Sequence, residues 1–210
     1  MARNTEENRG LLRSTLIDIA ERSIAEGGLP AIKARALAQA AGCSVGAIYN
    51  VFDDLQDLVL AVNGRTFARL GQRVLAALDG NDAQPPTERL IIIAHGYLDF
   101  ALDHPRLWRA LFDLRMAPDT DVPQWYRDDM RNLFAIIEGP VQECFPDFSE
   151  RDVALMTRAL FSSVHGIVLL GLENRLAAVP REELSHTLRM LLQAATGTAP
   201  VERPGASKAG

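Results

Sequence analysis

The sequence has few cysteines, no long apolar run and no surplus of positive charge, and each shortage excludes a class of protein. Its two cysteines, Cys43 and Cys144, cannot build a disulfide framework and lack the spacing of metal ligands. No run approaches the roughly 18 apolar residues of a membrane helix, because the richest, residues 164–172, is interrupted by a histidine and two glycines. The polar first ten residues lack the apolar core of a secretion signal. We therefore expect a cytoplasmic protein with no disulfide, metal site or membrane span.

The net charge of −5 argues against a nucleic-acid partner, because neutralising phosphates supplies most non-specific affinity. The distribution of charge changes this conclusion. Residues 1–50 hold six basic and five acidic side chains, whereas residues 51–150 hold nine basic and seventeen acidic ones. The acidic excess therefore lies in the middle of the chain and leaves the N-terminal segment nearly neutral.

Hydrophobic residues make up 48% of the chain, enough for a sizeable core, and they recur at helical spacing. We find no strand alternation and no internal repeat, so we expect an all-α fold of about nine helices. A first helix should run from residue 4 or 5 to 27, and two short helices should lie within 33–52. The later helices are expected at residues 55–78, 87–104, 106–116, 121–144, 149–177 and 180–195.

Turn and capping residues divide these helices into a small head and a larger body. The linker is residues 79–86, which are rich in turn-forming residues. We expect a head domain over residues 10–70, a body over residues 84–195 and a disordered tail over residues 196–210. Pro140 should kink or end the helix that contains it, and Ser149 with Asp152 should form a capping box.

The most informative stretch is residues 33–52, where two short helical patterns meet at a tight turn. Leu37 and Ala41 share a face of the first helix, and Ile48 shares a face of the second with Val51. A glycine in the turn suits positive φ, and Ser44 can cap the second helix. This pattern is typical of a helix-turn-helix, whose second helix enters the major groove of DNA. The alternative is a helix hairpin that serves only as core.

The segment ALAQAAGCSVGAIYNVF, residues 36–52, closely resembles the signature of the TetR family of bacterial transcriptional regulators. The resemblance covers about residues 10–70, and the order of the expected helices fits it. Residues 95–114 and 161–176 are similar to the subfamily named for a Trp-His-Gly motif. His165 and Gly166 match that motif, and Phe161 replaces the tryptophan.

This motif predicts a DNA-binding surface on the second helix and at the start of the first. The first turn of the second helix lies nearest the base edges, Gly46 permits close approach, and polar side chains contact bases or phosphates. The expected DNA-binding residues are Lys33, Arg35, Ser44, Val45, Gly46, Ala47, Tyr49 and Asn50. For Tyr49 the alternative is a half-buried core aromatic, and for Arg35 a solvated surface position.

Two departures from the family remove positive charge from this surface. Relatives often carry lysine near the start of the long helix, where this chain has Leu55, and often arginine or lysine after the capping serine, where it has Val45. Both changes favour a modest affinity for DNA, or readout by apolar contacts of Val45 and Ala47 with thymine methyl groups.

The resemblance also implies an effector pocket in the body, for a hydrophobic small molecule and with no other cofactor. The side chains we expect to line it are His95, Trp108, Phe112, Trp125, Tyr126, Phe134 and His165. Ordinary core packing is the alternative for each of them.

The last two helices are expected to form a homodimer surface, because small residues there permit close helix approach beside an apolar stripe. The expected interface residues are Ser162, Gly166, Ile167, Leu170, Leu184, Leu188 and Leu191. The alternative is a hairpin packed within one chain.

Together these observations predict a homodimeric, ligand-responsive repressor that binds a palindromic operator in double-stranded DNA. The main alternative is a helical ligand-binding protein with a weakened DNA face, suggested by Leu55 and the neighbouring Asp53, Asp54 and Asp57. An enzyme is poorly supported and no catalytic residue is expected, since the chain has no nucleophile elbow, phosphate loop or paired-carboxylate motif.

Overall fold

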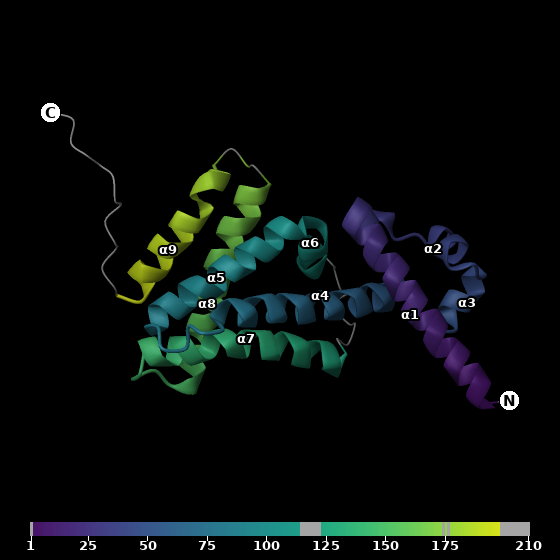
Figure 1. Cartoon of the computed structure of the whole chain (residues 1–210), viewed down its shortest axis with the longest axis horizontal. Coiled ribbons are helices and arrows are strands. Elements are labelled where there is room, and N and C mark those ends of the chain that lie inside the picture. The colour runs from purple at the N-terminus through teal and green to yellow at the C-terminus, as the bar shows by residue number, and fades with distance from the viewer. Residues whose placement is uncertain (1, 114–122, 174, 176, 198–210) are drawn as a thin grey trace. The chain divides into compact units, whose positions relative to one another are not determined.

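The computed structural model describes residues 2–113, 123–173, 175 and 177–197. Over these ranges the chain forms nine α-helices and two short 3₁₀ helices and contains no strand (Figure 1), which confirms the all-α prediction. In chain order the elements are α1 (Ala2–Gly27), η1 (Leu29–Ala31), α2 (Ala34–Ala41), α3 (Val45–Tyr49), α4 (Leu55–Leu78), α5 (Pro86–Asp103), α6 (Pro105–Asp113), α7 (Gln124–Cys144), α8 (Glu150–Leu172), η2 (Arg181–Glu183) and α9 (Leu184–Ala195).

Several helix ends follow directly from capping chemistry. Asp54 accepts a hydrogen bond at 2.7 Å from the Asp57 amide, and α4 has the predicted bounds. Ser149 accepts from the Asp152 amide at 3.2 Å and donates to its carboxylate at 2.6 Å, so Ser149 caps α8 with Asp152 as its partner.

Other ends differ from the prediction. Pro140 does not end α7, which continues to Cys144, and the neighbouring Val141 is fully buried, so its packing offsets the hydrogen bond that proline cannot donate. The last helix is preceded by η2, and α8 stops at Leu172 rather than near 177. The expected ends at Met116 and Asp121, and the tail beyond residue 197, lie outside the described residues.

The chain divides into two compact units, each described here by itself. The first comprises residues 1–73 with 99–133, and the second comprises 74–98 with 134–210. Residues 99–133, which the sequence assigned to the body, thus group with the head. The physical reason is α6, which packs against α1, with the Arg106 guanidinium donating to the Ala25 carbonyl at 3.1 Å.

The first unit has a hydrophobic core built from α1 to α4 and α6. Its fully or nearly fully buried members include Leu16, Ala20, Ile24, Leu37, Ile48, Phe52, Leu58, Val62 and Ala110. Outside this core, carboxylates of α1 pair with guanidinium groups of α4. Asp18 and Glu21 contact Arg65, and Glu21 also contacts Arg69. The N-terminal helix is therefore fixed to the long helix by apolar packing and by an ion-pair network.

The second unit is held by close packing of α8 on α9. A methyl group on Gly171 would lie 2.5 Å from a Leu184 methyl carbon, so the two helices approach through that glycine. Polar contacts add to this packing: Arg189 donates to both Glu88 carboxylate oxygens at 2.8 and 2.9 Å, and the His95 imidazole lies 3.1 Å from the Ser185 carbonyl.

Among the described helices, α8 is the one whose length and composition would allow it to cross a membrane, with a mean hydropathy of 1.7 over an 18-residue window. The match rests on length and composition alone, because α8 contains no uninterrupted apolar run of that length. Only 28% of that window is buried inside the chain. The helix therefore leaves much apolar surface uncovered within one copy.

Candidate nucleic-acid interface

The helix-turn-helix is formed by α2, a turn at Gly42 and α3, which lie beside α1 (Figure 1). Gly42 adopts φ 64° and ψ 31°, the left-handed conformation that glycine tolerates best, as the sequence predicted. Its amide donates to carbonyls in the last turn of α2, and the Cys43 amide donates to the Ala38 carbonyl at 3.0 Å. The turn thus satisfies the carbonyl groups at the end of α2 and redirects the chain into α3.

The second helix is capped and anchored on one side. Ser44 is the N-cap, and its hydroxyl oxygen accepts a hydrogen bond from the Ala47 amide at 3.2 Å. Ile48 is fully buried and Phe52 is 2% exposed, so the C-terminal part of this segment inserts into the head core. The opposite side of α3 is consequently held at the surface by a rigid support.

The predicted DNA-binding residues lie on this outer side. Lys33, Arg35, Ser44, Gly46 and Asn50 are exposed, and Val45 and Ala47 are half-buried. The Tyr49 side chain is 48% exposed, so its hydroxyl-bearing ring lies partly at the surface. No atom lies within 3.4 Å of a Cβ built on Gly46, and the Ser44 hydroxyl at 3.9 Å is the one neighbour within 4 Å. The first turn of α3 is therefore open to a close approach by another molecule.

Leu55 and the neighbouring Asp54 have structural roles. Leu55 is partly buried and packs against the head core, and Asp54 caps α4 through the Asp57 amide. At the position where relatives often carry lysine, this chain therefore has a leucine that packs against the core. Lys33 and Arg35 remain the exposed basic side chains on the motif itself.

Comparisons with known proteins agree with this geometry. Residues 16–62 match the family described as bacterial regulatory proteins, tetR family, and residues 90–203 match the tetracyclin repressor-like C-terminal domain. This chain belongs to the TetR family. The Trp-His-Gly subtype of the C-terminal domain stays a prediction.

Curated relatives of this TetR-family chain include two HTH-type transcriptional regulators from Mycobacterium tuberculosis, strains CDC 1551 / Oshkosh and H37Rv. Each is 32% identical over 106 residues, which cover 50% of this chain and 50% of the relative. The chain thus spans about half the length of these curated relatives.

Solved structures show the same fold at lower identity. A protein from Rhodococcus sp. RHA1 superposes with a TM-score of 0.70 at 24% identity, covering 90% of this chain and 95% of that one. A TetR-family regulator from Streptomyces coelicolor gives 0.63 at 19% identity, covering 89% and 98%. FadR from Bacillus subtilis, solved in complex with stearoyl-CoA, gives 0.66 at 19% identity, covering 87% and 98%.

The residues expected to line an effector pocket in this TetR-family chain are divided between the two units. Trp108, Phe112, Trp125 and Tyr126 belong to the first unit, whereas His95, Phe134 and His165 belong to the second. Trp108 is 2% exposed and Tyr126 is 5% exposed, and Tyr126 packs edge-to-face on Phe67 at 5.3 Å.

In the second unit the aromatic cluster includes two residues that the prediction left out. The Phe161 ring contacts Phe134 edge-to-face at 5.1 Å and stacks on the His165 ring at 5.7 Å. The Tyr97 hydroxyl lies 2.7 Å from His165 Nδ1, and burial lowers the pKa of His165. The helical spacing of Phe161 and His165, four residues apart, was the signal that could have identified Phe161. Tyr97 had no comparable signal.

The expected dimer residues also separate into two kinds. Ser162 and Leu170 are exposed, and Gly166, Ile167 and Leu191 are partly exposed. Leu184 and Leu188 are 1% and 0% exposed within a single chain. Their assignment to a dimer surface was wrong, because they fill the core between α8 and α9.

Proposed function

We propose that this protein is a homodimeric, ligand-responsive transcriptional repressor that binds a palindromic operator through α3. The observation that carries the proposal is the first turn of α3, which is capped by Ser44, supported by buried Ile48 and open around Gly46. A helix N-terminus presented in this way fits the major groove, where its first residues reach base edges. The family assignment supports a regulatory role.

The proposed dimer uses α8. Its exposed positions include Leu155 and Leu170, which are 53% and 47% exposed, and the helix is apolar over most of its length. Exposed apolar surface of this extent is typical of an interaction face. A two-fold pairing through α8 would give the protein two recognition helices, whose separation would match a palindrome.

The proposed effector is a hydrophobic small molecule held in the second unit near the cluster of Tyr97, Phe134, Phe161 and His165. The stearoyl-CoA complex of the FadR neighbour indicates that a protein with this fold can hold an acyl ligand. Effector binding would tilt α4 and change the separation of the two heads. It would lower operator affinity only by the difference in its affinity for the two conformations.

The test is a gel shift at low salt with DNA fragments that flank the protein's own gene. We expect a shift for a palindromic fragment with the wild-type chain and none with Gly46→Leu. The variant should fold normally, since only the Ser44 hydroxyl lies within 4 Å of the added Cβ. The matched control is Gly139→Leu on α7, where no atom lies within 4 Å of the added Cβ. This variant should bind the palindromic fragment as the wild type does. Binding that survives Gly46→Leu would exclude α3 from the groove.

Analytical ultracentrifugation tests the dimer separately. Leu170→Glu should convert the dimer to a monomer, because a carboxylate would be buried without a partner. Leu75→Glu, at a residue of α4 that is 54% exposed, should leave the dimer intact. A wild-type chain that sediments as a monomer at micromolar concentration would refute the dimer. A dimer that shifts no palindrome would favour the ligand-binding alternative.

A further inference from the structure

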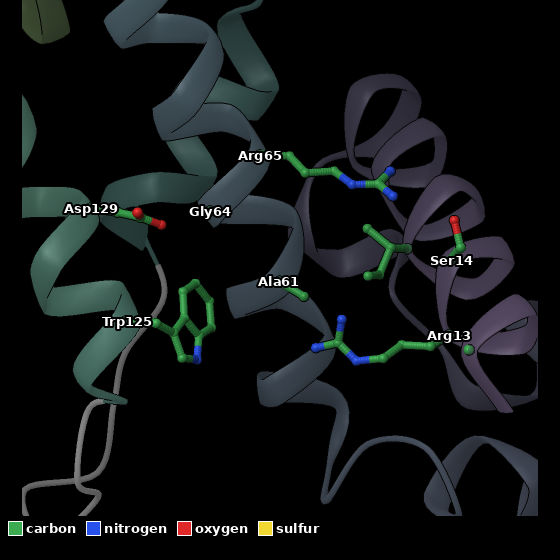
Figure 2. Close-up of a pocket in the computed structure, with 9 residues that line it drawn as sticks. Arg13, Ser14, Ala61, Gly64, Arg65, Trp125 and Asp129 are labelled. Atoms are coloured by element: carbon green, nitrogen blue, oxygen red, sulfur yellow. The ribbon is translucent and has the colours of Figure 1, made fainter. Parts of the chain in front are cut away.

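A pocket of about 510 Å³ lies in the first unit between α1, α4 and α7 (Figure 2). It shares no residue with the aromatic cluster of the second unit or with the predicted DNA-binding residues. The residues that line it are Gly10, Arg13, Ser14, Ile17, Ala61, Gly64, Arg65, Trp125 and Asp129. A volume of this size is within the range of small-molecule sites.

The α4 wall of the pocket includes two small residues, Ala61 and Gly64, next to Arg65. A methyl group on Gly64 would lie 2.8 Å from the six-membered ring of Trp125 and 3.5 Å from an Asp129 carboxylate oxygen. Glycine is therefore what allows the indole to lie against α4. The indole packs edge-to-face on Tyr126 at 5.6 Å and stays 41% exposed, so an aromatic surface faces the pocket from a supported position.

Two charges in the pocket have no ion-pair partner among the described residues. Arg65 is engaged by Asp18 and Glu21, and its hydrogen bond to Asp18 raises its pKa. Arg13 makes no such pair. Its guanidinium carbon lies 5.0 Å above the centre of the Phe52 ring, which supports the side chain. Figure 2 shows this guanidinium pointing across Ala61 toward Trp125.

The second charge is the carboxylate of Asp129, on the α7 side of the pocket beside Trp125 (Figure 2). It too makes no ion pair in the described part of the chain. A cation from α1 on one wall, and a carboxylate with an exposed indole from α7 on the other, form a combination that apolar packing does not require. Each group matches one part of a molecule that carries both charges and a ring.

We propose that this pocket binds a small aromatic zwitterion, of the chemical class of an aromatic α-amino acid. The ligand carboxylate pairs with Arg13, its ammonium group pairs with Asp129, and its ring packs on Trp125. A ligand held this way joins α1 to α7 across α4. This site is not part of the proposed repressor function. Ligand binding to it can be measured without DNA.

Isothermal titration calorimetry of the full chain, without DNA, tests the charge requirement with three probes that share one ring. L-phenylalanine carries both charges, 3-phenylpropionate only the carboxylate and phenethylamine only the ammonium group. We expect phenylalanine to bind at least about tenfold more tightly than either of the others, because each charge-assisted contact is worth roughly that factor. Equal binding of the three, or no binding of phenylalanine at millimolar concentration, would overturn the proposal.

Variants assign the contacts. Arg13→Gln should reduce phenylalanine affinity to that of phenethylamine and leave phenethylamine affinity unchanged. Asp129→Asn should reduce it to that of 3-phenylpropionate and leave that probe unchanged. Either variant that keeps wild-type phenylalanine affinity contradicts its assigned contact. Thermal unfolding of each variant checks that the chain is folded. If Arg13→Gln lowers the stability of the head, Asp129→Asn still tests the proposal.

A glycine pair on α4 tests the pocket wall. Gly64→Ala should displace the Trp125 ring and weaken phenylalanine binding at least about tenfold. Gly71→Ala is the matched control, since its added methyl group would lie 3.9 Å from Leu133, an ordinary contact, and it should bind as the wild type does. Equal affinities of the two variants would show that the ligand does not use this wall.

Discussion

Gly42 and Gly46 lie four residues apart in the same motif, but the backbone requires glycine at only one of them. Gly42 has φ 64°, where an L side chain is strained, whereas the neighbourhood of Gly46 leaves room for a Cβ. Substitution at Gly42 should therefore report on folding of the head. Substitution at Gly46 should report on what approaches α3 from outside.

His165 gives the second unit a predictable dependence on pH. Burial lowers its pKa below the ordinary value of 6.5, so the folded state binds its proton less well than the unfolded state does. The stability that the neutral ring contributes is present above about pH 6.5 and is lost as the pH falls through the lowered folded-state pKa.

Urea unfolding at pH 7.5 and 5.5 checks this expectation. The wild type should be less stable at the lower pH, and His165→Gln should lose part of that difference because glutamine does not titrate. His104→Gln, at an exposed histidine, should keep the wild-type difference. A His165→Gln variant with the full wild-type difference would assign the effect to another group.

At the scale of the element, two glycines of α8 should behave differently. A Cβ on Gly171 would lie 2.5 Å from Leu184, which is 1% exposed and cannot move aside, so Gly171→Ala should lower the free energy of unfolding by about 1–3 kcal/mol. Gly166 has nothing within 4 Å. Gly166→Ala should keep or raise the stability of a single chain, because alanine favours the helix.

The measurement is chemical unfolding of both variants in a background that carries Leu170→Glu, so that dimer formation does not contribute. Equal stability of the two variants would mean that α8 and α9 are not packed through Gly171.

The helices were more predictable than the partners of their apolar faces. The bounds of α4 could be predicted because Asp54 caps its start and turn-forming residues follow its end. The stripe on α9 was recognised from its periodicity, but periodicity cannot distinguish a face that packs inside one chain from one that packs on a second copy. Leu184 and Leu188 were misassigned for that reason.

The candidate sites show the same limit at the level of single residues. The exposed residues of the helix-turn-helix could be located because the turn and the cap fix which side of α3 is buried. The pocket on α4 could not be found from the sequence, since it depends on Gly64 and Trp125, 61 positions apart, meeting in space. Trp125 was named as a ligand residue, but Arg13 and Asp129 were not.

For the whole molecule, the small number of basic side chains on the DNA face predicts a weak salt dependence. Lys33 and Arg35 are the exposed basic residues of the motif, so a dimer would place four such cations on phosphates. The slope of log K against log salt concentration should then be about −4. Gel shifts or fluorescence anisotropy between 50 and 300 mM salt would measure it, and a slope near −10 would require many cations outside the motif.

The two tryptophans of the chain differ strongly in solvent exposure, so their intrinsic fluorescence can be separated. Trp108 is 2% exposed and Trp125 is 41% exposed, so acrylamide should quench one component of the emission and spare the other. Trp125→Phe should remove the quenched component and leave a single population with emission at shorter wavelength. The lifetime of the accessible indole would then follow movements of α7 against α4 without any attached dye.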